Sequence, residues 1–292
     1  MPAPSRRTAL VVSGLTLGVV ATGCGEGATP PPARTGGRSD GPDETLLGEA
    51  RTDLVAALAL VRAARRAHPS LRPRLVGLQR THRDQLSVLD PEVTYTLPPR
   101  QIANGVADAF VHIIEQYLTY PSAARVQDGF AETLLRTLIE LGPKALETPE
   151  DYDVRANLMW TATLALNGLI GAGVPQDWAS HMIGHEITAL NDTDHARTLA
   201  VVLPSLMNDQ RGPKREKLLQ YAANVWDIRE GSDDARIDAV IEATRGFFEQ
   251  VGIKTRLGDY AIAAPEIDRI VAALKDHGMT ALGEQNAITP VA

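Results

Sequence analysis

The chain has 292 residues, which is enough for one large domain or two ordinary ones. Only 4% of the residues are aromatic and Ala and Leu are abundant, a composition that favours helices over sheets. The formal net charge of −7 provides no basic stripe for phosphates, which argues against nucleic acid as a main partner.

The first 24 residues have the pattern of an export signal. Arg6 and Arg7 precede the apolar run 9–21, and the run is followed by small residues and Cys24. The run is too short to span a bilayer as a helix. It resembles a bacterial lipoprotein signal, in which Cys24 would become a lipidated N-terminus that anchors the chain to the cell envelope. The alternative is a leader that is never processed.

Two further segments precede the main body of the chain. Residues 25–45 are dominated by Gly, Pro, Ser and Thr, which predicts a disordered tether. Residues 46–88 predict a helical hairpin, because apolar residues recur at helical spacing from Leu47 to Val61 and Pro69 ends the first helix. This hairpin faintly resembles the start of ferritin-like actinobacterial lipoproteins.

From residue 89 onward the pattern predicts one short extended segment and then helices. Val93, Tyr95 and Leu97 alternate with polar residues, which predicts a strand. Helices are expected at about 99–120, 123–141, 150–170, 176–190, 196–208, 213–227, 234–252 and 264–277. Gly142-Pro143 predicts a helix end. The helix within 155–173 is apolar nearly all round, so we expect it at the centre of the core.

Asp108 and His112 are the first candidates for chemistry. They lie one turn apart on an expected helix, close enough to share an ion. The alternative is an ordinary polar pair on a solvated face. Their neighbours from residue 106 to residue 114 are otherwise apolar, so the helix should be largely buried, and a buried carboxylate needs a strong partner. This favours a metal-ligand role.

Three further histidines follow in the segment HMIGHEITALNDTDH. His181 and His185 stand four residues apart, and His195 opens the next expected helix. Gly184 and the position of Glu186 exclude the HExxH and HxxEH patterns of zinc hydrolases. Taken alone, the pair is equally consistent with one packed and one exposed helix histidine. His195 alone is consistent with a residue near a turn.

A set of one carboxylate and three imidazoles would define the metal class. Asp108, His112, His181 and His195 offer one anionic oxygen and three neutral nitrogens. Such a set suits Fe²⁺ or Zn²⁺, whereas Mg²⁺ and Ca²⁺ prefer shells made almost entirely of oxygen.

The segments LPPRQIANGVADAFVHIIEQY and GLIGAGVPQDWASHMIGHEITALNDTDHARTLAVVLP together resemble the iron-containing alcohol dehydrogenase family. The likeness runs over about 89–289 and is closest to the NADPH-dependent butanol dehydrogenase and aldehyde reductase branch. It implies a helical metal-binding domain over 89–292 and a small alcohol or aldehyde as substrate. It also implies NAD(P)H as hydride donor, and we expect a homo-oligomer.

The resemblance also implies residue roles. Asp108, His112, His181 and His195 would bind the divalent ion. His185 would lie near the nicotinamide and the bound alcohol, where it could relay a proton. The family's α/β dinucleotide-binding domain, with its Gly-Gly-Gly-Ser stretch, has no counterpart in this sequence except the strand expected around Val93.

Two functions follow from these features. The first is a metal-dependent alcohol dehydrogenase or aldehyde reductase. We expect its activity to be impaired, because the sequence shows no phosphate-binding loop for the coenzyme. The second is an envelope lipoprotein with a non-catalytic metal-binding helical domain. A fusion of two gene pieces, joined between Leu86 and Asp90, would also explain the mismatch.

The N-terminal mass of the mature protein tests the leader. If it is a lipoprotein signal, mass analysis of the membrane fraction should find a chain that begins at a lipidated Cys24. An intact Met1 in soluble protein would contradict the envelope location.

Overall fold

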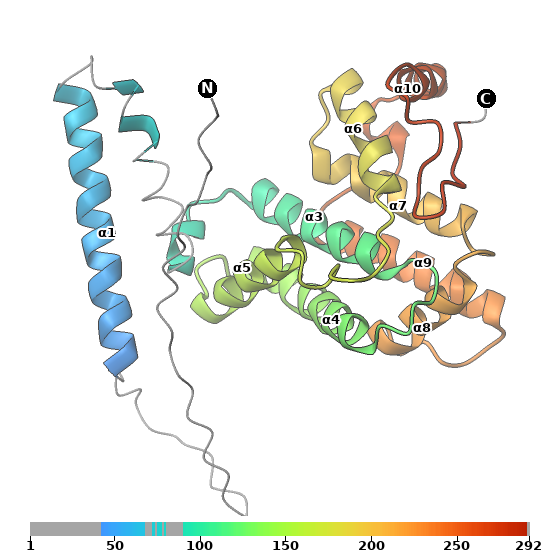
Figure 1. Cartoon of the computed structure of the whole chain (residues 1–292), viewed down its shortest axis with the longest axis horizontal. Coiled ribbons are helices and arrows are strands. Elements are labelled where there is room, and N and C mark those ends of the chain that lie inside the picture. Colours follow the sequence, from blue (N-terminus) through green and yellow to red (C-terminus); the bar gives the residue numbers. More distant parts are fainter. Residues whose placement is uncertain (1–41, 68–71, 74, 78, 80–89, 291–292) are drawn as a thin grey trace, which may run out of the picture.

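The computed structural model describes residues 42–67, 72–73, 75–77, 79 and 90–290 (Figure 1). The predicted leader with Cys24, the tether up to residue 41 and most of the second hairpin helix lie outside these residues and stay predictions. Among the described residues, no helix combines the length and the apolar character that crossing a bilayer requires.

Helix α1 (Pro42–Ala67) confirms the first helix of the predicted hairpin and begins inside the predicted tether. Proline is well suited to a first helical turn, because its fixed φ matches the helix and its missing N–H has no partner there anyway. Arg51 connects α1 to the main body through ion pairs with Asp90 and, at 2.6 Å, with Glu92. Figure 1 shows the rest of α1 standing apart from that body.

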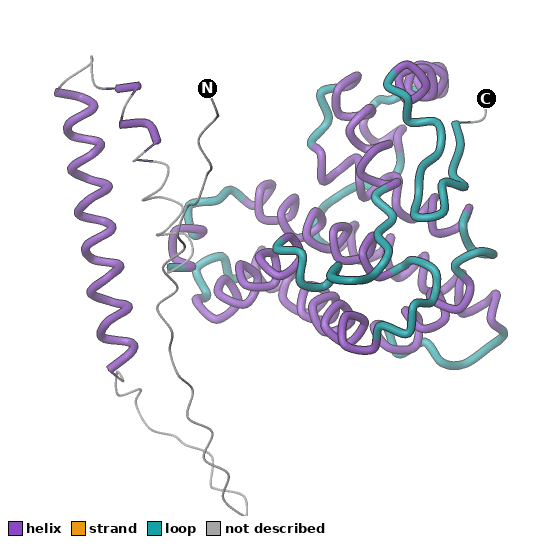
Figure 2. Tube along the Cα trace, viewed as in Figure 1, coloured by secondary structure: helices purple, strands orange, loops and turns teal. Residues whose placement is uncertain are grey.

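The main body is a helical bundle, as predicted. Its helices are α3 (Pro99–Tyr117), α4 (Arg125–Glu147), α5 (Tyr152–Leu166), α6 (Ala179–Asn191), α7 (His195–Asp209), α8 (Arg215–Val225), α9 (Asp233–Gln250) and α10 (Ala264–Asp276). A short 3₁₀ helix, η3 (Leu257–Tyr260), precedes α10. Within the described residues there is no strand, and only an isolated antiparallel bridge joins Leu282 to Ile288 (Figure 2).

The strand predicted around Val93 is wrong. The segment forms a 3₁₀ helix, η2 (Pro91–Thr94), in which Asp90 accepts a hydrogen bond of 3.0 Å from the Glu92 backbone N–H. An extended segment must place its backbone hydrogen bonds in a neighbouring strand. No such strand exists among the described residues, so a locally satisfied turn is favoured.

The helix end predicted at Gly142-Pro143 is also wrong, because α4 continues through Pro143 to Glu147. The apolar face of α4 continues on both sides of the proline through Leu138 and Ala145, which are buried. Gly142 lets α3 approach closely, since a Cβ there would lie 2.8 Å from Val106 Cγ1. Packing against α3 therefore offsets the cost of about 3 kcal/mol for a proline in a helix interior.

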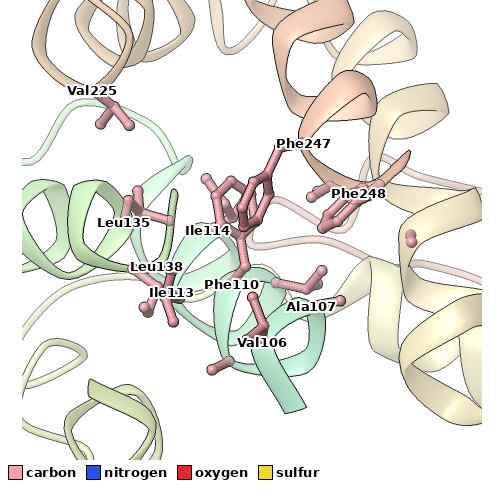
Figure 3. Close-up of a cluster of buried hydrophobic side chains, with 14 of the residues drawn as sticks. Val106, Ala107, Phe110, Ile113, Ile114, Leu135, Leu138, Val225, Phe247 and Phe248 are labelled. Carbon is pink, nitrogen blue, oxygen red and sulfur yellow. The ribbon is translucent and has the colours of Figure 1, made fainter. Parts of the chain in front are cut away.

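The central helix is α3, and the prediction that 155–173 holds this place is wrong. Helix α3 packs against α4, α5, α6 and α7, whereas α5 leaves Trp160 61% exposed. Figure 3 shows α3 side chains packed among residues of α4, α8 and α9. Twelve of the 19 residues of α3 are buried, so every polar group on this helix must find a partner.

Phe110 is the centre of the aromatic part of this core. Its ring centroid lies 5.0 Å from that of Phe247 and 5.4 Å from that of Phe248, and the residue is fully buried (Figure 3). The tilted and edge-on arrangements are those that aromatic pairs prefer. This cluster fixes α9 against α3.

Replacing Phe110 with alanine should lower the free energy of unfolding by about 3–5 kcal/mol, because the change leaves a cavity in the core. Phe130→Ala is a matched control, since Phe130 is 46% exposed and should lose far less. Chemical denaturation of both variants measures the difference. Equal losses would show that Phe110 does not occupy a packed core position.

Candidate metal centre

Three helices bring the predicted site residues together. Helix α3 carries Asp108 and His112, α6 carries His181 and His185, and α7 begins at His195. These three helices pack against one another. Positions far apart in the sequence therefore meet on one side of the bundle.

Gly184 allows the close crossing of α6 and α7. A Cβ at this position would lie 2.9 Å from Leu199 Cδ2 and 3.0 Å from Thr198 Oγ1. Thr198 Oγ1 also donates a hydrogen bond of 3.0 Å to the Gly184 carbonyl oxygen, so the two helices cross closely at this point. Any larger side chain would push α7 away and separate His181 from His195.

The candidate ligand atoms converge. His112 Nε2 lies 3.1 Å from His181 Nε2, and Asp108 Oδ2 lies 3.8 Å from His112 Nε2. Asp108 Oδ1 lies 3.8 Å from His195 Nε2, so this carboxylate lies near both His112 and His195. Each of Asp108, His112 and His181 offers an atom within 4.8 Å of the others, a spacing that a metal ion could bridge.

His185 has a different environment. It is exposed, and its ring stacks on that of His195 with centroids 4.6 Å apart and planes 21° apart. Its ring centroid is 6.1 Å from that of His181. His185 therefore borders the cluster on its solvent side without belonging to its core.

The polar atoms of the cluster fit a divalent cation. Asp108 Oδ1 is buried and has no hydrogen-bond partner among the described residues. Burial, followed by repulsion from His181, lowers the pKa of His112 to about 4, against an attraction to Asp108. Burial also lowers the pKa of His195. Both imidazoles are therefore neutral at pH 7 and keep a lone pair for a metal.

Glu115 orients His181, and the sequence reasoning missed it. Its carboxylate is buried and accepts hydrogen bonds from His181 Nδ1–H and from the Ser180 backbone N–H. With the proton on Nδ1, the Nε2 lone pair of His181 is directed at His112. A carboxylate behind a ligating histidine also raises its basicity. The sequence did indicate it, as an acidic residue one helical turn after His112 among apolar neighbours.

Asp194 positions His195, and it too was missed. Arg100 donates two hydrogen bonds of 2.7 Å to its carboxylate, and Asn104 donates a third of 2.8 Å. These bonds attach the start of α7 to the first turns of α3. The same hydrogen bond from Arg100 lowers the pKa of Asp194, so the carboxylate is charged at neutral pH.

A cavity of about 350 Å³ opens beside the cluster. Asp108 and His195 form one part of its lining, and the remainder is polar or small: Gln101, Asn104, Gly105, Asp194 and Ala196. A small molecule in this cavity could reach the same carboxylate and imidazole that face the ion position.

Residues 102–287 match the C-terminal part of the Fe-containing alcohol dehydrogenase family, which is about two thirds of the chain. The chain belongs to the iron-containing alcohol dehydrogenase family. This confirms the resemblance seen in the sequence, and the match includes all five predicted site residues and Glu115.

The similar proteins are reductases and dehydrogenases. The NADPH-dependent aldehyde reductase YqhD of Escherichia coli is 65% identical over 203 residues, which cover 70% of this chain and 52% of YqhD. NADH-dependent butanol dehydrogenase A of Clostridium acetobutylicum is 37% identical, over 68% of this chain and 52% of its own length. The chain therefore spans about half the length of the curated relatives it matches.

Solved structures agree with the fold of this part. The substrate- and cofactor-free form of YqhD superposes with a TM-score of 0.68 at 64% identity, over 69% of this chain and 53% of YqhD. The Thermotoga maritima butanol dehydrogenase A superposes with a TM-score of 0.62 at 34% identity, over 68% of this chain and 48% of its own. The helical bundle of this chain is thus the one that these family members share.

A titratable pair joins α6, at the residue after His185, to the end of α10. Glu186 is buried and accepts a hydrogen bond of 2.7 Å from His277 Nδ1, at the end of α10. This bond, together with the negative charge of Glu186, raises the pKa of His277 above its ordinary value. The raised pKa means that the protonated His277 stabilises the fold. That stability is complete below about pH 6.5, the ordinary histidine pKa, and is lost as the pH rises through the raised value.

An NMR titration should find the pKa of His277 above about 6.5. Glu186→Gln should return it toward that value, because the amide carries no charge. The thermal midpoint of the wild type should also fall as the pH rises through the titration, and that of Glu186→Gln should change less. A His277 pKa at or below the ordinary value would show that the pair does not form.

Proposed function

We propose that the chain binds one divalent ion, Fe²⁺ or Zn²⁺, and contributes the metal half of an aldehyde reductase. The ligands would be Asp108, His112, His181 and His195. The observation that carries the proposal is the convergence of Asp108, His112 and His181, whose ligand atoms lie within 4.8 Å of one another. His195 Nε2 lies 3.8 Å from Asp108 Oδ1, a buried oxygen without a hydrogen-bond partner among the described residues. The substrate class, aldehydes and primary alcohols, follows from the relatives.

The ligand set suits carbonyl reduction. With one anionic and three neutral ligands, a bound ion would keep a net positive charge and act as a Lewis acid on the carbonyl oxygen. NAD(P)H would supply the hydride. YqhD, which shares 65% identity with this chain, is NADPH-dependent, and this favours NADPH over NADH as the donor.

The protein's own residues hold and complete this site. Asp108 and the three imidazoles would hold the ion on packed helices, and Glu115 keeps His181 in the required tautomer. Carbonyl reduction adds a hydride to carbon and a proton to oxygen. His185 is the group we assign to that proton transfer, because it is exposed and stacked against His195 at the border of the site.

Metal binding is the part of this function that the described residues support by themselves. Among them, no glycine-rich loop joins a strand to a helix, the arrangement that binds a dinucleotide pyrophosphate. We therefore expect weak coenzyme binding by these residues, and metal content is the more direct test of the site.

Metal analysis of the purified chain tests the proposal. The wild type, reconstituted with Fe²⁺ or Zn²⁺ and freed of excess ion, should hold about one ion per chain. His181→Ala should lose it, since the variant removes one ligand of four. His277→Ala is the matched control, because this exposed histidine contacts Glu186 and not the cluster. Wild-type protein that takes up neither metal would refute the proposal.

The same preparation offers a second comparison. Glu115→Gln should still bind the ion, but with about 10- to 100-fold lower affinity, which is typical for loss of a carboxylate behind a metal-bound histidine. Any NADPH-dependent reduction of an aldehyde should require the ion and should fall in His185→Ala while its metal content is unchanged. Loss of metal from His185→Ala would instead make His185 a ligand.

A further inference from the structure

A second cavity lies between α3, α4 and α5, with a volume of about 210 Å³. Its walls are mostly apolar and include Ile102, Val106, Ala109, Leu138, Leu158 and Ala162. On a comparable measure, one water molecule needs about 10–15 Å³, and a dry cavity of about 150 Å³ takes up benzene. The space is therefore large enough for a small organic molecule.

One cation lines this apolar cavity. Arg155 of α5 is only 4% exposed, and its Nε donates a hydrogen bond of 2.7 Å to the Pro149 carbonyl oxygen. Its Nη2 is buried and has no hydrogen-bond partner among the described residues. No carboxylate within the described part of the chain forms an ion pair with it, and burial lowers its pKa.

This arrangement is unlike that of the other buried ions. Lys217 is similarly buried, yet it pairs with Asp128 at 2.8 Å, and Glu115 pairs with His181. A buried charge without a partner is among the most costly features in a protein interior. The bond from Nε to Pro149 explains how the Arg155 side chain is held, but it leaves Nη2 without a partner among the described residues.

We propose that this cavity binds a small organic monocarboxylate with an apolar body, of about the size of hexanoate or benzoate. Its carboxylate would accept hydrogen bonds from the Arg155 guanidinium, and its hydrocarbon part would fill the apolar space.

The chemistry of the walls selects this ligand class. The planar guanidinium matches a carboxylate in shape and charge. A phosphate would bring a second negative charge into a cavity with a single cation. Thr94, the one hydroxyl in the lining, already donates to the Pro91 carbonyl oxygen at 2.7 Å. An uncharged alcohol would fill the space but leave the cation without a counter-ion.

Isothermal titration calorimetry on the full chain tests the proposal with three probes. Hexan-1-ol has the same chain as hexanoate without the charge. Hexanoate should bind at least about tenfold more tightly, because the free energy of a hydrogen bond to a charged group corresponds to at least that ratio of affinities. Acetate, which has the charge without the chain, should also bind more weakly. Equal affinity for hexanoate and hexan-1-ol, or for hexanoate and acetate, would overturn the proposal.

Variants separate this site from the metal centre. Arg155→Met should lose the preference for hexanoate, and Ala162→Leu should weaken binding by filling the cavity while keeping the cation. Arg66→Met, at an exposed arginine of α1, is the matched control and should bind like the wild type. Because carboxylates can also coordinate metals, hexanoate binding should persist in metal-free His181→Ala. Binding that disappears in that variant would overturn the proposal without affecting the proposed reductase function.

The stability of Arg155→Met distinguishes a ligand site from a structural arginine. Removal of an unpaired buried charge should leave the thermal midpoint equal or higher. A large fall in the midpoint, together with unchanged hexanoate binding in Ala162→Leu, would show that Arg155 serves only the fold.

Discussion

Burial of α3 is the constraint on which the rest of the structure depends. Helices α4, α5, α6 and α7 all pack against it, and most of its side chains are removed from water. A helix in this position can carry polar residues only where other elements supply partners. Asp108, His112 and Glu115 are such residues, and their partners come from α6 and α7.

The cluster is held from two sides. Gly184 brings the backbones of α6 and α7 together, while Arg100 and Asn104 attach Asp194 to α3. His181 and His195 are therefore placed by helix packing and not by flexible loops. Sites built on packed helices keep their geometry well, which is what a metal with strict ligand distances requires. Membership of the dehydrogenase family agrees with this arrangement.

The buried ions of the domain fall into two groups. Glu115 and Lys217 each face an opposite or protonatable group, so their charges are compensated within the fold. Arg155 lines a mostly apolar cavity and donates to one backbone carbonyl. The charges of Glu115 and Lys217 therefore belong to the protein's own structure, whereas the charge of Arg155 is suited to a ligand. The same reasoning that identifies the metal centre thus points to a second site elsewhere on α3.

Local pattern in the sequence determined much of this protein. Helical periodicity predicted the helices from residue 99 to residue 277, and four-residue spacing predicted the pairs Asp108 with His112 and His181 with His185. Both are properties of a single helix, so neighbouring residues suffice to define them. Family resemblance added the role of His185.

Tertiary structure alone decided the rest. Glu115 and His181 are 66 positions apart in the sequence, and only the packing of α6 on α3 shows that they meet. Pro143 stays helical because α3 packs against Gly142, and the segment around Val93 turns because no described strand lies beside it. Long-range contacts can outweigh local preference. Burial of a helix face stabilises the fold by more than a single proline in a helix, or a single alternating run outside a sheet, destabilises it.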